Sequence, residues 1–339
     1  MSMKIVFPHD PTKIGGPSTF QLLITEHLIQ KNIEILPAGS KEKADVVFVI
    51  GGTRKLLWLA IQKFNGAKIL FRLDGLNWKH KIKIKSFKHL VYSEIHNYIS
   101  IIIRKFYADA VVYQSKFIKE WWVSKYGDTK KDDFVVHNGT DMGVFYPVVN
   151  SSNIANLPSI ICVEGKIEFD MPTCLVIKAL HDSLIEKKLI KHIDIWGEYA
   201  VEFDTFFKDY SNISFKGACC RSRIPDLLTN SDIFLNLEII PPCPNAVIEA
   251  LSCGLPVVGF SNGAMSELVP DDSGGLANYG ANPWRLDNPN VESLIIVIKK
   301  VISNLDNFKK AARNHAVQNY DIKRIGFRYE NIIKNLIIT

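Results

Sequence analysis

Residues 241–260 read PPCPNAVIEALSCGLPVVGF, and they predict a loop, a helix and a buried strand in that order. Three prolines within the first four positions exclude a helix before Pro244, because proline lacks the N–H and is tolerated only in a helix's first turn. Asn245 is a candidate helix cap, with Pro244 as the alternative start, and residues 246–253 form helix readily. Gly254 suits the left-handed turn that ends a helix, and the β-branched run that follows favours a strand.

Glu249 is the only charged residue in the predicted helix. It lies about one turn from the helix start, where free backbone N–H groups and the positive end of the helix dipole favour anions. The start of this helix is therefore a candidate site for a negatively charged ligand, with Glu249 close to it. A glutamate that interacts only with its own helix remains the open alternative.

The segment around this helix, residues 232–287, resembles the donor-binding core of the GT-B glycosyltransferases of family 4. The resemblance rests on EALSCGLPVV at 249–258, NGAMSELV at 262–269 and GG at 274–275. It is strongest to a subgroup with C-P-N-x-V-I-E-A-L and Y-G-x-N-P-W, which occur here at 243–251 and 279–284. The resemblance implies an α/β protein of GT-B fold: two Rossmann-like, doubly wound domains facing a cleft, and a C-terminal helix crossing back to the first domain.

The whole chain is long enough for two domains. Its 339 residues suggest two rather than one, and a hydrophobic share of 47% suffices for two sizeable cores. A charged share of 22% excludes a disordered chain. The net charge of +6 favours anionic partners, a class that includes nucleotide phosphates, a membrane surface and nucleic acid.

The cysteines and the apolar runs indicate the cellular compartment of the protein. Its six cysteines show neither C-x-x-C spacing nor a histidine cluster, so they fit free thiols in a reducing cytoplasm better than disulfides or a zinc site. No apolar run approaches the roughly 20 residues that a membrane span needs, and the N-terminal run is too short for a signal-peptide core. We therefore expect a cytoplasmic protein, with the inner face of the membrane as an additional location.

The first part of the chain alternates strands and helices. Strands are predicted at 4–7, 44–50, 68–73, 110–114 and 133–137. Each is followed by turn residues and usually by a helical segment, which indicates a parallel, doubly wound sheet. Ligands bind at the carboxyl ends of such strands, and the candidates there are Gly52, Thr53, Arg54, Arg72, Asp74 and Ser115.

Two further predictions depend on the resemblance as well as on position. The first domain of GT-B enzymes receives the acceptor, so Arg54, Arg72 and Asp74 are expected on the acceptor side. Gly16 lies in a glycine loop after the first strand, which in GT-B enzymes faces the cleft, so it is a candidate donor-binding residue. A tight turn without a ligand remains an alternative for Gly16.

The boundary between the domains is expected near residue 150. Residues 138–141 match the family's N-G-x-D motif, and a polar linker is predicted at 150–153. The expected domains are 1–150 with the C-terminal helix 319–339, and 151–318. In the second domain, strands are predicted at 159–163, 191–196, 212–215 and 231–237, and helices at 171–184, 224–229, 291–304 and 307–320. A last helix at 322–338 is expected to return to the first domain.

Transfer of an activated sugar requires an anchored nucleotide, a stabilised diphosphate leaving group and a placed acceptor hydroxyl. Metal-independent enzymes stabilise the diphosphate with helix N-termini and basic side chains. The helix start, with Asn245 and Ala246, suits that role, and so does Lys166. No cofactor and no catalytic metal are expected, because the sequence carries no D-x-D motif beside a strand.

By resemblance, Glu249 matches the second glutamate of the family's E-x7-E motif, which binds the ribose hydroxyls. The first glutamate, which contacts the sugar ring, is expected at position 241, where this chain has Pro241. Glu238, three residues earlier, or Asn245 is then expected to contact the sugar instead. The expected catalytic residues are Lys166, Asp74 and Glu238.

Further donor-binding positions also come from the resemblance. Gly217, Ala218 and Arg223 match the region where the family holds the base. Glu267 matches the glutamate of the family's G-G-x-x-E motif, which often faces the cleft, and a structural cap of the following turn is its alternative. The later phosphate-binding lysine of many family members has no clear match.

Residues 78–88 read WKHKIKIKSFK and contain five lysines and no acid. A solvated basic loop is one interpretation. The other is a patch, Lys79–Lys88, that faces anionic lipid or a phosphorylated acceptor, since each lysine near an anionic surface contributes about 1 kcal/mol. Nucleic acid is not an expected partner, because little besides Trp78 and Phe87 could stack on bases.

The leading hypothesis is a hexosyltransferase-type enzyme of polysaccharide biosynthesis. It would move a sugar from a nucleoside-diphosphate sugar to a glycan or lipid-linked acceptor, with retention and without a metal ion. Two alternatives stay open. A GT-B sugar-nucleotide epimerase would want more carboxylates and histidines in the cleft, and Pro241 favours a catalytically degenerate protein that binds nucleotide-sugar without turnover.

Overall fold

The structure is a computed structural model that describes residues 2–11, 15–83, 86–148 and 157–338. The chain divides into two compact units: unit 1 is Met1–Gly139 with Ile322–Thr339, and unit 2 is Thr140–Asp321. The sequence placed the boundary after residue 150, whereas the structure assigns 140–148 to unit 2. Within unit 2 the carbonyl of Phe145 accepts from Arg313 Nη1 at 2.8 Å. The predicted linker 150–153 lies outside the described residues.

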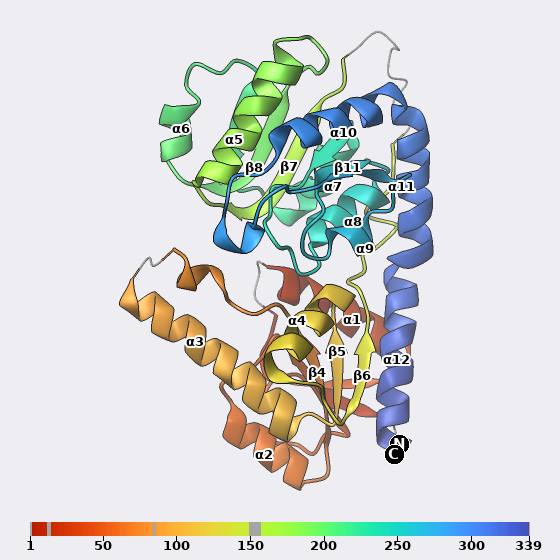
Figure 1. Cartoon of the computed structure of the whole chain (residues 1–339). Helices are drawn as coiled ribbons and strands as arrows, with labels where there is room; N and C mark the ends of the chain where they lie inside the picture. The colour runs from red at the N-terminus through yellow and green to blue at the C-terminus, as the bar shows by residue number, and fades with distance from the viewer. Residues whose placement is uncertain (1, 12–14, 84–85, 149–156, 339) are drawn as a thin grey trace. The chain divides into compact units, whose positions relative to one another are not determined.

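Unit 1 is built on six parallel strands in the order β2-β1-β3-β4-β5-β6 (Figure 1). The strands are β1 Lys4–Val6, β2 Glu34–Leu36, β3 Val46–Ile50, β4 Lys68–Leu73, β5 Ala110–Tyr113 and β6 Asp132–Val135. The parallel, doubly wound sheet is therefore confirmed. The strand order changes direction between β1 and β3, and a ligand is expected at the carboxyl ends beside such a switch.

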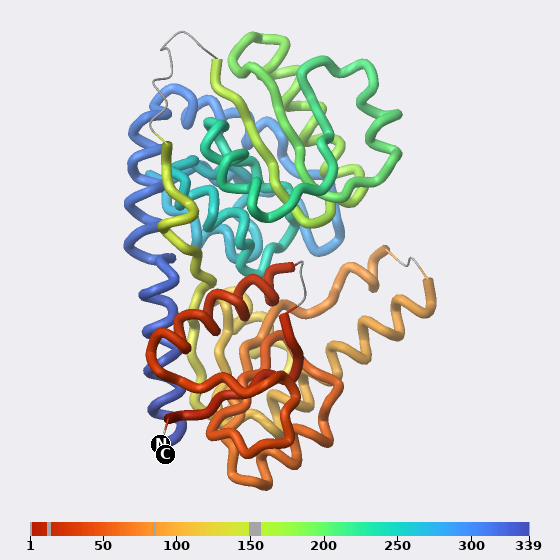
Figure 2. The backbone as a smooth tube through the Cα atoms, turned by 180° about the vertical axis from the view of Figure 1, so that it is seen from behind, coloured from red at the N-terminus to blue at the C-terminus, as the bar shows by residue number. Residues whose placement is uncertain are grey.

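The helices of unit 1 cover both faces of this sheet. They are α1 Gly16–Gln30, α2 Leu56–Phe64, α3 Phe87–Ile102, α4 Lys116–Tyr126 and α12 Ile322–Ile338, with a 3₁₀ turn at Lys79–Lys81 and a π-helical turn at Ile103–Tyr107. Right-handed crossovers place α2, α3 and α4 on one face and α1 on the other. Figures 1 and 2 show α4 and α1 on opposite sides of the strands.

The C-terminal helix α12 completes the core of unit 1, as the sequence predicted. Its apolar residues Ile325, Tyr329, Ile332, Ile333 and Leu336 join the cluster formed by the strands and α1. The Tyr329 ring lies 5.2 Å from that of Phe20 and 5.5 Å from that of Phe48, between ring centroids. Unit 1 is thus built from both ends of the chain.

Gly326 allows α12 to approach α1 closely. A Cβ at this position would lie 2.4 Å from His27 Cγ and 2.6 Å from two other ring atoms. His27 is buried, so its ring has little room to move away. We expect Gly326→Ala to lower the free energy of unfolding by about 1–3 kcal/mol in urea denaturation, the usual cost of overpacking. Gly165→Ala is the control, because a Cβ there meets nothing within 4 Å. Equal stability of the two variants would contradict the prediction.

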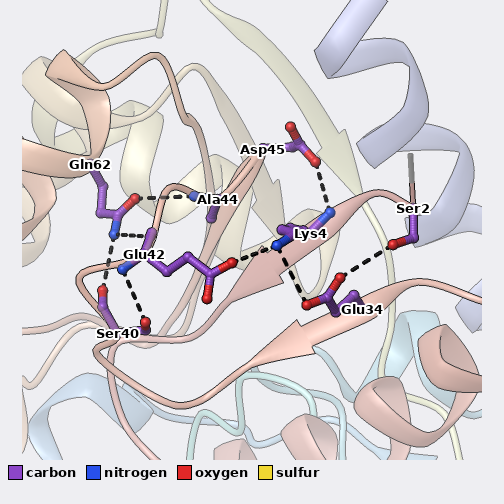
Figure 3. A network of polar contacts seen from close by, with 8 residues as sticks. All are labelled: Ser2, Lys4, Glu34, Ser40, Glu42, Ala44, Asp45 and Gln62. Carbon is purple, nitrogen blue, oxygen red and sulfur yellow. Dashed lines mark hydrogen bonds and ion pairs between the residues drawn. The ribbon is translucent and has the colours of Figure 1, made fainter.

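A polar network fixes the amino-terminal edge of the same sheet (Figure 3). Lys4 Nζ lies 2.5 Å from Glu42 Oε1 and 3.6 Å from Glu34 Oε1, and Lys4 N donates to Asp45 Oδ2 at 2.7 Å. Gln62 of α2 donates to the carbonyls of Ser40 and Glu42 at 3.0 and 2.9 Å. Helix α2 therefore directs a buried polar side chain toward the body of unit 1.

Unit 2 has a second sheet of six parallel strands, in the order β12-β11-β10-β7-β8-β9. The strands are β7 Ile160–Ile167, β8 Ile193–Tyr199, β9 Ile213–Gly217, β10 Ile233–Leu235, β11 Val257–Phe260 and β12 Gly274–Ala277. The helices are α5 Met171–Leu180, α6 Glu202–Phe206, α7 Ile224–Thr229, α8 Asn245–Ser252, α9 Met265–Leu268, α10 Val291–Ser303 and α11 Leu305–Asn319. A separate apolar core holds this unit together.

Several elements of unit 2 differ from the sequence prediction, and two of the differences are more than a shift of an end by one to three residues. Strand β7 was expected to end at residue 163 but runs on to Ile167, with a register shift between Val163 and Lys166. Lys166 therefore lies in a strand and not in the loop that follows one. The helix expected at 171–184 changes to a π-helical turn at His181–Ile185.

Candidate functional site

Glu249 is the buried carboxylate of helix α8. The residue is 3% exposed, and its Oε1 accepts from Arg221 Nη2 at 2.6 Å. Burial raises the pKa of the Glu249 carboxyl above its usual value, and the charge and hydrogen bond of Arg221 oppose that rise. The helix starts after Pro244, which was the alternative start, and Asn245 is its first residue. Gly254 has φ +76°, the left-handed ending that the sequence predicted.

Arg221 is the partner of Glu249 that the sequence did not reveal. Its side chain is 42% exposed, and its guanidinium carbon lies 5.6 Å from the Phe145 ring centroid. It belongs to the 3₁₀ turn Arg221–Arg223, which follows β9. The resemblance pointed to Arg223 of this turn, and the residue pattern does not tell which of the two arginines faces α8.

The loop after β9 holds the other residues expected near the base. Gly217 ends the strand with φ +73°, and Ala218 and Arg223 are exposed. The Arg223 guanidinium carbon lies 5.5 Å from the Trp196 ring centroid. Within the described residues, the buried Trp196 Nε1 has no hydrogen-bond partner. The turn after β9 thus combines an exposed cation and an indole at the carboxyl ends of β8 and β9.

Lys166 is exposed near the end of β7, where its backbone pairs with Glu198 of β8. Glu238, half-buried, follows β10 and lines a small cavity. The cavity is also lined by Thr173, Asn236, Phe260, Asn262 and Tyr279. Both predicted catalytic residues of unit 2 therefore lie at the carboxyl edge of its sheet.

Pro241, at the position of the family's first glutamate, is buried against the following loop. Gly263 has φ +58°, and a Cβ there would lie 2.5 Å from the carbonyl oxygen of Pro241. Ile240 N donates to Asn262 Oδ1 at 2.6 Å, which fixes the same loop. The segment is a tightly packed turn, with no side chain at position 241 that could contact a sugar hydroxyl.

The remaining candidates of unit 2 surround the start of α8 and the next helix. Asn245 and Ala246 are half-buried in the first turn of α8. Glu267 is half-buried in α9, whose backbone begins directly after the Gly263 turn. The structure thus gathers the unit 2 candidates at one edge of the sheet, and Glu249 is the most deeply buried acid among them.

Arg72 is buried at the carboxyl end of β4, with 1% of its surface exposed. It donates to Asp74 Oδ1 at 2.6 Å, to Gln114 Oε1 at 3.0 Å and to Asn138 Oδ1. Its guanidinium carbon lies 4.2 Å from the Phe20 ring centroid of α1. The sequence placed Arg72 on the acceptor side; the structure buries its side chain and pairs it with Asp74.

Asp74 is the accessible member of this cluster, with 26% of its side chain exposed. Gly51 has φ +70°, and a Cβ there would lie 2.6 Å from Asp74 Oδ2, so the β3 loop needs a glycine to approach the carboxylate. Arg54 is exposed, but its guanidinium carbon lies 4.6 Å from the Tyr92 ring of α3. Gly16 is exposed as the first residue of α1.

His9 is a further polar residue at this edge, and it was not among the residues predicted from the sequence. It follows β1, and its Nε2 lies 2.8 Å from Thr53 Oγ1. Partial burial and the neighbouring Lys55 lower the pKa of His9, which favours a neutral imidazole. Its position after a strand was the only available signal, because one histidine gives no spacing pattern.

One group of possible metal ligands occurs among the described residues: His181, Asp182 and Glu186, with ligand atoms within 4.8 Å of one another. Lys178 Nζ lies 3.1 Å from Asp182 Oδ2, so a cation already neutralises that carboxylate. The group precedes β8 and therefore lies toward the amino end of the sheet, away from the candidate site.

None of the helices in the described ranges is both long and apolar enough to span a bilayer.

Comparisons with known proteins show which family model, sequence and structures the chain is similar to. Residues 160–304 match the family model described as Glycosyl transferases group 1. The chain is 32% identical over 93 residues to one component of the phosphatidylinositol N-acetylglucosaminyltransferase of Arabidopsis thaliana. This match spans 27% of the present chain and only 19% of that relative.

Solved structures resemble the chain over nearly its whole length. Sucrose-phosphate synthase from Thermosynechococcus elongatus has a TM-score of 0.75 at 13% identity, covering 99% of each chain. HepE from Anabaena, in complex with UDP-glucose, has a TM-score of 0.70 at 16% identity, covering 98% of this chain and 100% of that one. At these identities the likeness shows the fold alone, and it confirms the GT-B fold that the sequence implied.

Proposed function

We propose that this chain, whose residues 160–304 match the group 1 glycosyl transferase model and which has the GT-B fold, is a glycosyltransferase that moves a sugar from a nucleoside-diphosphate sugar to a glycan or lipid-linked acceptor. The proposal includes retention of configuration and no need for a metal ion. The observation that carries it is Glu249, an acid buried in α8 at the position of the family's ribose-binding glutamate. HepE binds UDP-glucose in the same fold, which supports this class of donor.

Different residues of unit 2 bind different parts of the donor. Glu249 accepts hydrogen bonds from the ribose hydroxyls, and the α8 start with Asn245 and Ala246 stabilises the diphosphate together with Lys166. Gly217, Ala218 and Arg223 hold the base. Glu238 contacts the sugar, since position 241 offers no polar side chain. Glu267 supports the loop beside the diphosphate.

The reaction forms a bond between an acceptor hydroxyl oxygen and the anomeric carbon of the donor. The bond from that carbon to the diphosphate oxygen breaks, the nucleoside diphosphate leaves, and the hydroxyl proton passes to the leaving diphosphate. Charge develops on the diphosphate, so Lys166 and the backbone N–H groups of α8 act where the charge grows. Asp74, held by Arg72, orients the acceptor hydroxyl.

The acceptor belongs to an anionic class. Lys79–Lys88 lies in unit 1, and within it the described Lys81 and Lys88 are exposed, while Lys85 lies outside the described residues. The relative from Arabidopsis thaliana has phosphatidylinositol in its name, which is consistent with a lipid-linked class. The proposed place of action is the cytoplasmic face of a membrane.

A thermal-shift panel of nucleoside diphosphates, followed by an assay of diphosphate release, tests the proposal. One nucleotide is expected to raise the melting temperature by mass action, and its sugar derivative is expected to turn over only with acceptor, with or without a chelator. Isomerised donor would indicate the epimerase. Binding without any turnover would indicate the degenerate protein, and activity abolished by chelator and restored by manganese would contradict the metal-free mechanism.

A further inference from the structure

Helix α3 presents apolar side chains to solvent and turns polar side chains inward. Four residues share its outward face and form what we call the α3 stripe: Phe87, Val91, Ile95 and Tyr98. They are 80%, 37%, 46% and 63% exposed, and their spacing of three and four residues aligns them along the helix. The buried face consists of Ser93, Asn97 and Ser100. A surface helix normally has the reverse arrangement, so packing within unit 1 does not account for the stripe.

Hydrogen bonds fix this orientation of α3. Asn97 Oδ1 accepts from the backbone N–H of Asn77 at 2.9 Å, and Asn97 Nδ2 donates to the carbonyl of Asn77 at 3.0 Å. Beside it, a Cβ on Gly52 would lie 3.3 Å from Ser100 Oγ, which shows how closely the β3 loop packs on the helix. A roll that buried the stripe would break these contacts, so its exposure is built into the fold.

Positive charge is concentrated in the stretch of sequence that contains the stripe, although Arg104 of this stretch is buried. Residues 78–107 contain seven lysines and arginines and one acid, Glu94, so their net charge of +6 equals that of the whole protein. Glu94 is itself neutralised, because its Oε1 lies 2.7 Å from His80 Nε2 and 2.8 Å from Lys81 Nζ. The surface is therefore both apolar and cationic.

Helix α2 extends the same character. Leu57, Ile61 and Phe64 are 77%, 49% and 93% exposed, while Gln62 points inward to the network of Figure 3. Figures 1 and 2 show α2 beside the C-terminal end of α3. The contact of Arg54 with the Tyr92 ring links the start of α2 to α3. Among the described residues, two neighbouring helices thus leave their apolar faces exposed.

We propose that the α3 stripe, with the exposed face of α2 and the surrounding lysines, is a docking surface for an anionic lipid bilayer. Apolar and aromatic side chains enter the headgroup boundary, where Tyr is favoured, and the lysines contact lipid phosphates. Binding to the bilayer does not depend on the proposed function. The further step, that this binding brings the enzyme to a lipid-linked acceptor, rests on the proposed function.

Charge decides between a bilayer and a second copy of the chain. A symmetric dimer formed through this surface would bring the same patch of each copy together. Both patches carry the exposed cations Lys81, Lys88 and Lys105 against the one acid Glu94, so the like charges would repel each other. An anionic membrane complements that charge and accepts the apolar stripe as well.

Co-sedimentation of the full chain with vesicles tests the proposal, using phosphatidylcholine alone and phosphatidylcholine with phosphatidylglycerol. The parent is expected to bind the anionic vesicles, and Phe87→Ser/Ile95→Ser/Tyr98→Ser to bind them at least tenfold more weakly. The matched control is Val201→Ser/Ile296→Ser/Val317→Ser, three exposed apolar residues of unit 2, which should bind like the parent. Lys83→Gln/Lys88→Gln should bind the anionic vesicles more weakly than the parent, and the difference should be largest at low salt, where charge attraction is least screened.

Three results would overturn the inference. The parent binds no vesicles, or the stripe variant binds vesicles as well as the parent does. In the third, the parent is a dimer in analytical ultracentrifugation and the stripe variant is a monomer. Because the changed side chains are exposed, the melting temperature of the stripe variant should equal that of the parent. Its thermal shift with nucleotide should also be unchanged. Vesicle binding by a chain that binds no nucleotide would contradict the proposed function and leave the docking surface standing.

Discussion

Replacing Glu249 by glutamine is expected to weaken nucleoside diphosphate binding by about tenfold to a hundredfold, because a charge-assisted hydrogen bond contributes about 1.5–3 kcal/mol. The fold should remain intact. Glutamine has the same shape and can still accept from Arg221 through its amide oxygen, and it removes a charge that burial disfavours. Isothermal titration calorimetry measures the affinity, and thermal melting checks the fold.

Glu202→Gln, an exposed acid of α6, is the control and should bind nucleotide like the parent. Unchanged affinity in Glu249→Gln would rule out the ribose contact. A lower melting temperature without ligand would mean that Glu249 serves the fold.

The variant Arg221→Gln tests the same site through the pH dependence of nucleotide binding. Burial raises the pKa of Glu249 and Arg221 opposes the rise, so removing Arg221 raises that pKa further. The carboxyl must be ionised to accept from two hydroxyls. As the pH is lowered, both proteins are therefore expected to lose nucleotide affinity. The variant should begin to lose it at a higher pH than the parent. Comparison with the parent cancels the titration of the nucleotide's own phosphate. Parallel pH profiles would show that Arg221 does not act through Glu249.

Replacing Arg72 by methionine is expected to give the largest loss of stability, because each buried acceptor left without its donor costs about 1–3 kcal/mol. Asp74 would keep its charge without a cation, and the oxygens of Gln114 and Asn138 would lose their shared donor. Methionine fills part of the space above Phe20 but offers no hydrogen bond. Urea unfolding measures the change.

Arg54→Met is the matched control for Arg72. This arginine is exposed and lies against the Tyr92 ring, so its replacement should change stability by no more than about 0.5–1 kcal/mol. If both variants unfold at the same urea concentration, Arg72 is not the organising residue of the unit 1 edge.

The elements that the sequence predicted best have strong local signals. The helix at 322–338 has the predicted bounds, because its apolar residues recur at helical spacing along one face. The ending of α8 at Gly254 follows from the need for a positive φ. Strand β2 was missed, because three residues, Glu34–Leu36, give too short a pattern to separate from a loop.

The sequence placed the candidate residues at or after strand ends but did not show how deeply each side chain is buried. Arg72 and Arg54 both follow or end strands of one sheet, yet one is buried and the other exposed. That difference arises from Asp74, Gln114 and Asn138, which converge on Arg72 from separate strands and loops. Arg221 and Arg223 could not be told apart for the same reason, because only the folded turn decides which faces Glu249.

Helix α3 shows a further limit of pattern reading. Its apolar residues recur at helical spacing, but a period does not tell which face is inside. The inward face is set by Asn97, whose hydrogen bonds to Asn77 connect residues twenty positions apart. The sequence therefore indicated a basic segment at 79–88, while the exposed stripe became visible only in the fold.

A crystal structure of the chain with UDP-glucose, and with the sugar nucleotide of any other diphosphate that raises the melting temperature, tests the central claim most directly. We predict that both ribose hydroxyls lie within hydrogen-bonding distance of the Glu249 carboxylate, about 2.6–3.2 Å, and that the diphosphate lies at the start of α8. A nucleotide bound elsewhere, with Glu249 still paired to Arg221 alone, would contradict the account.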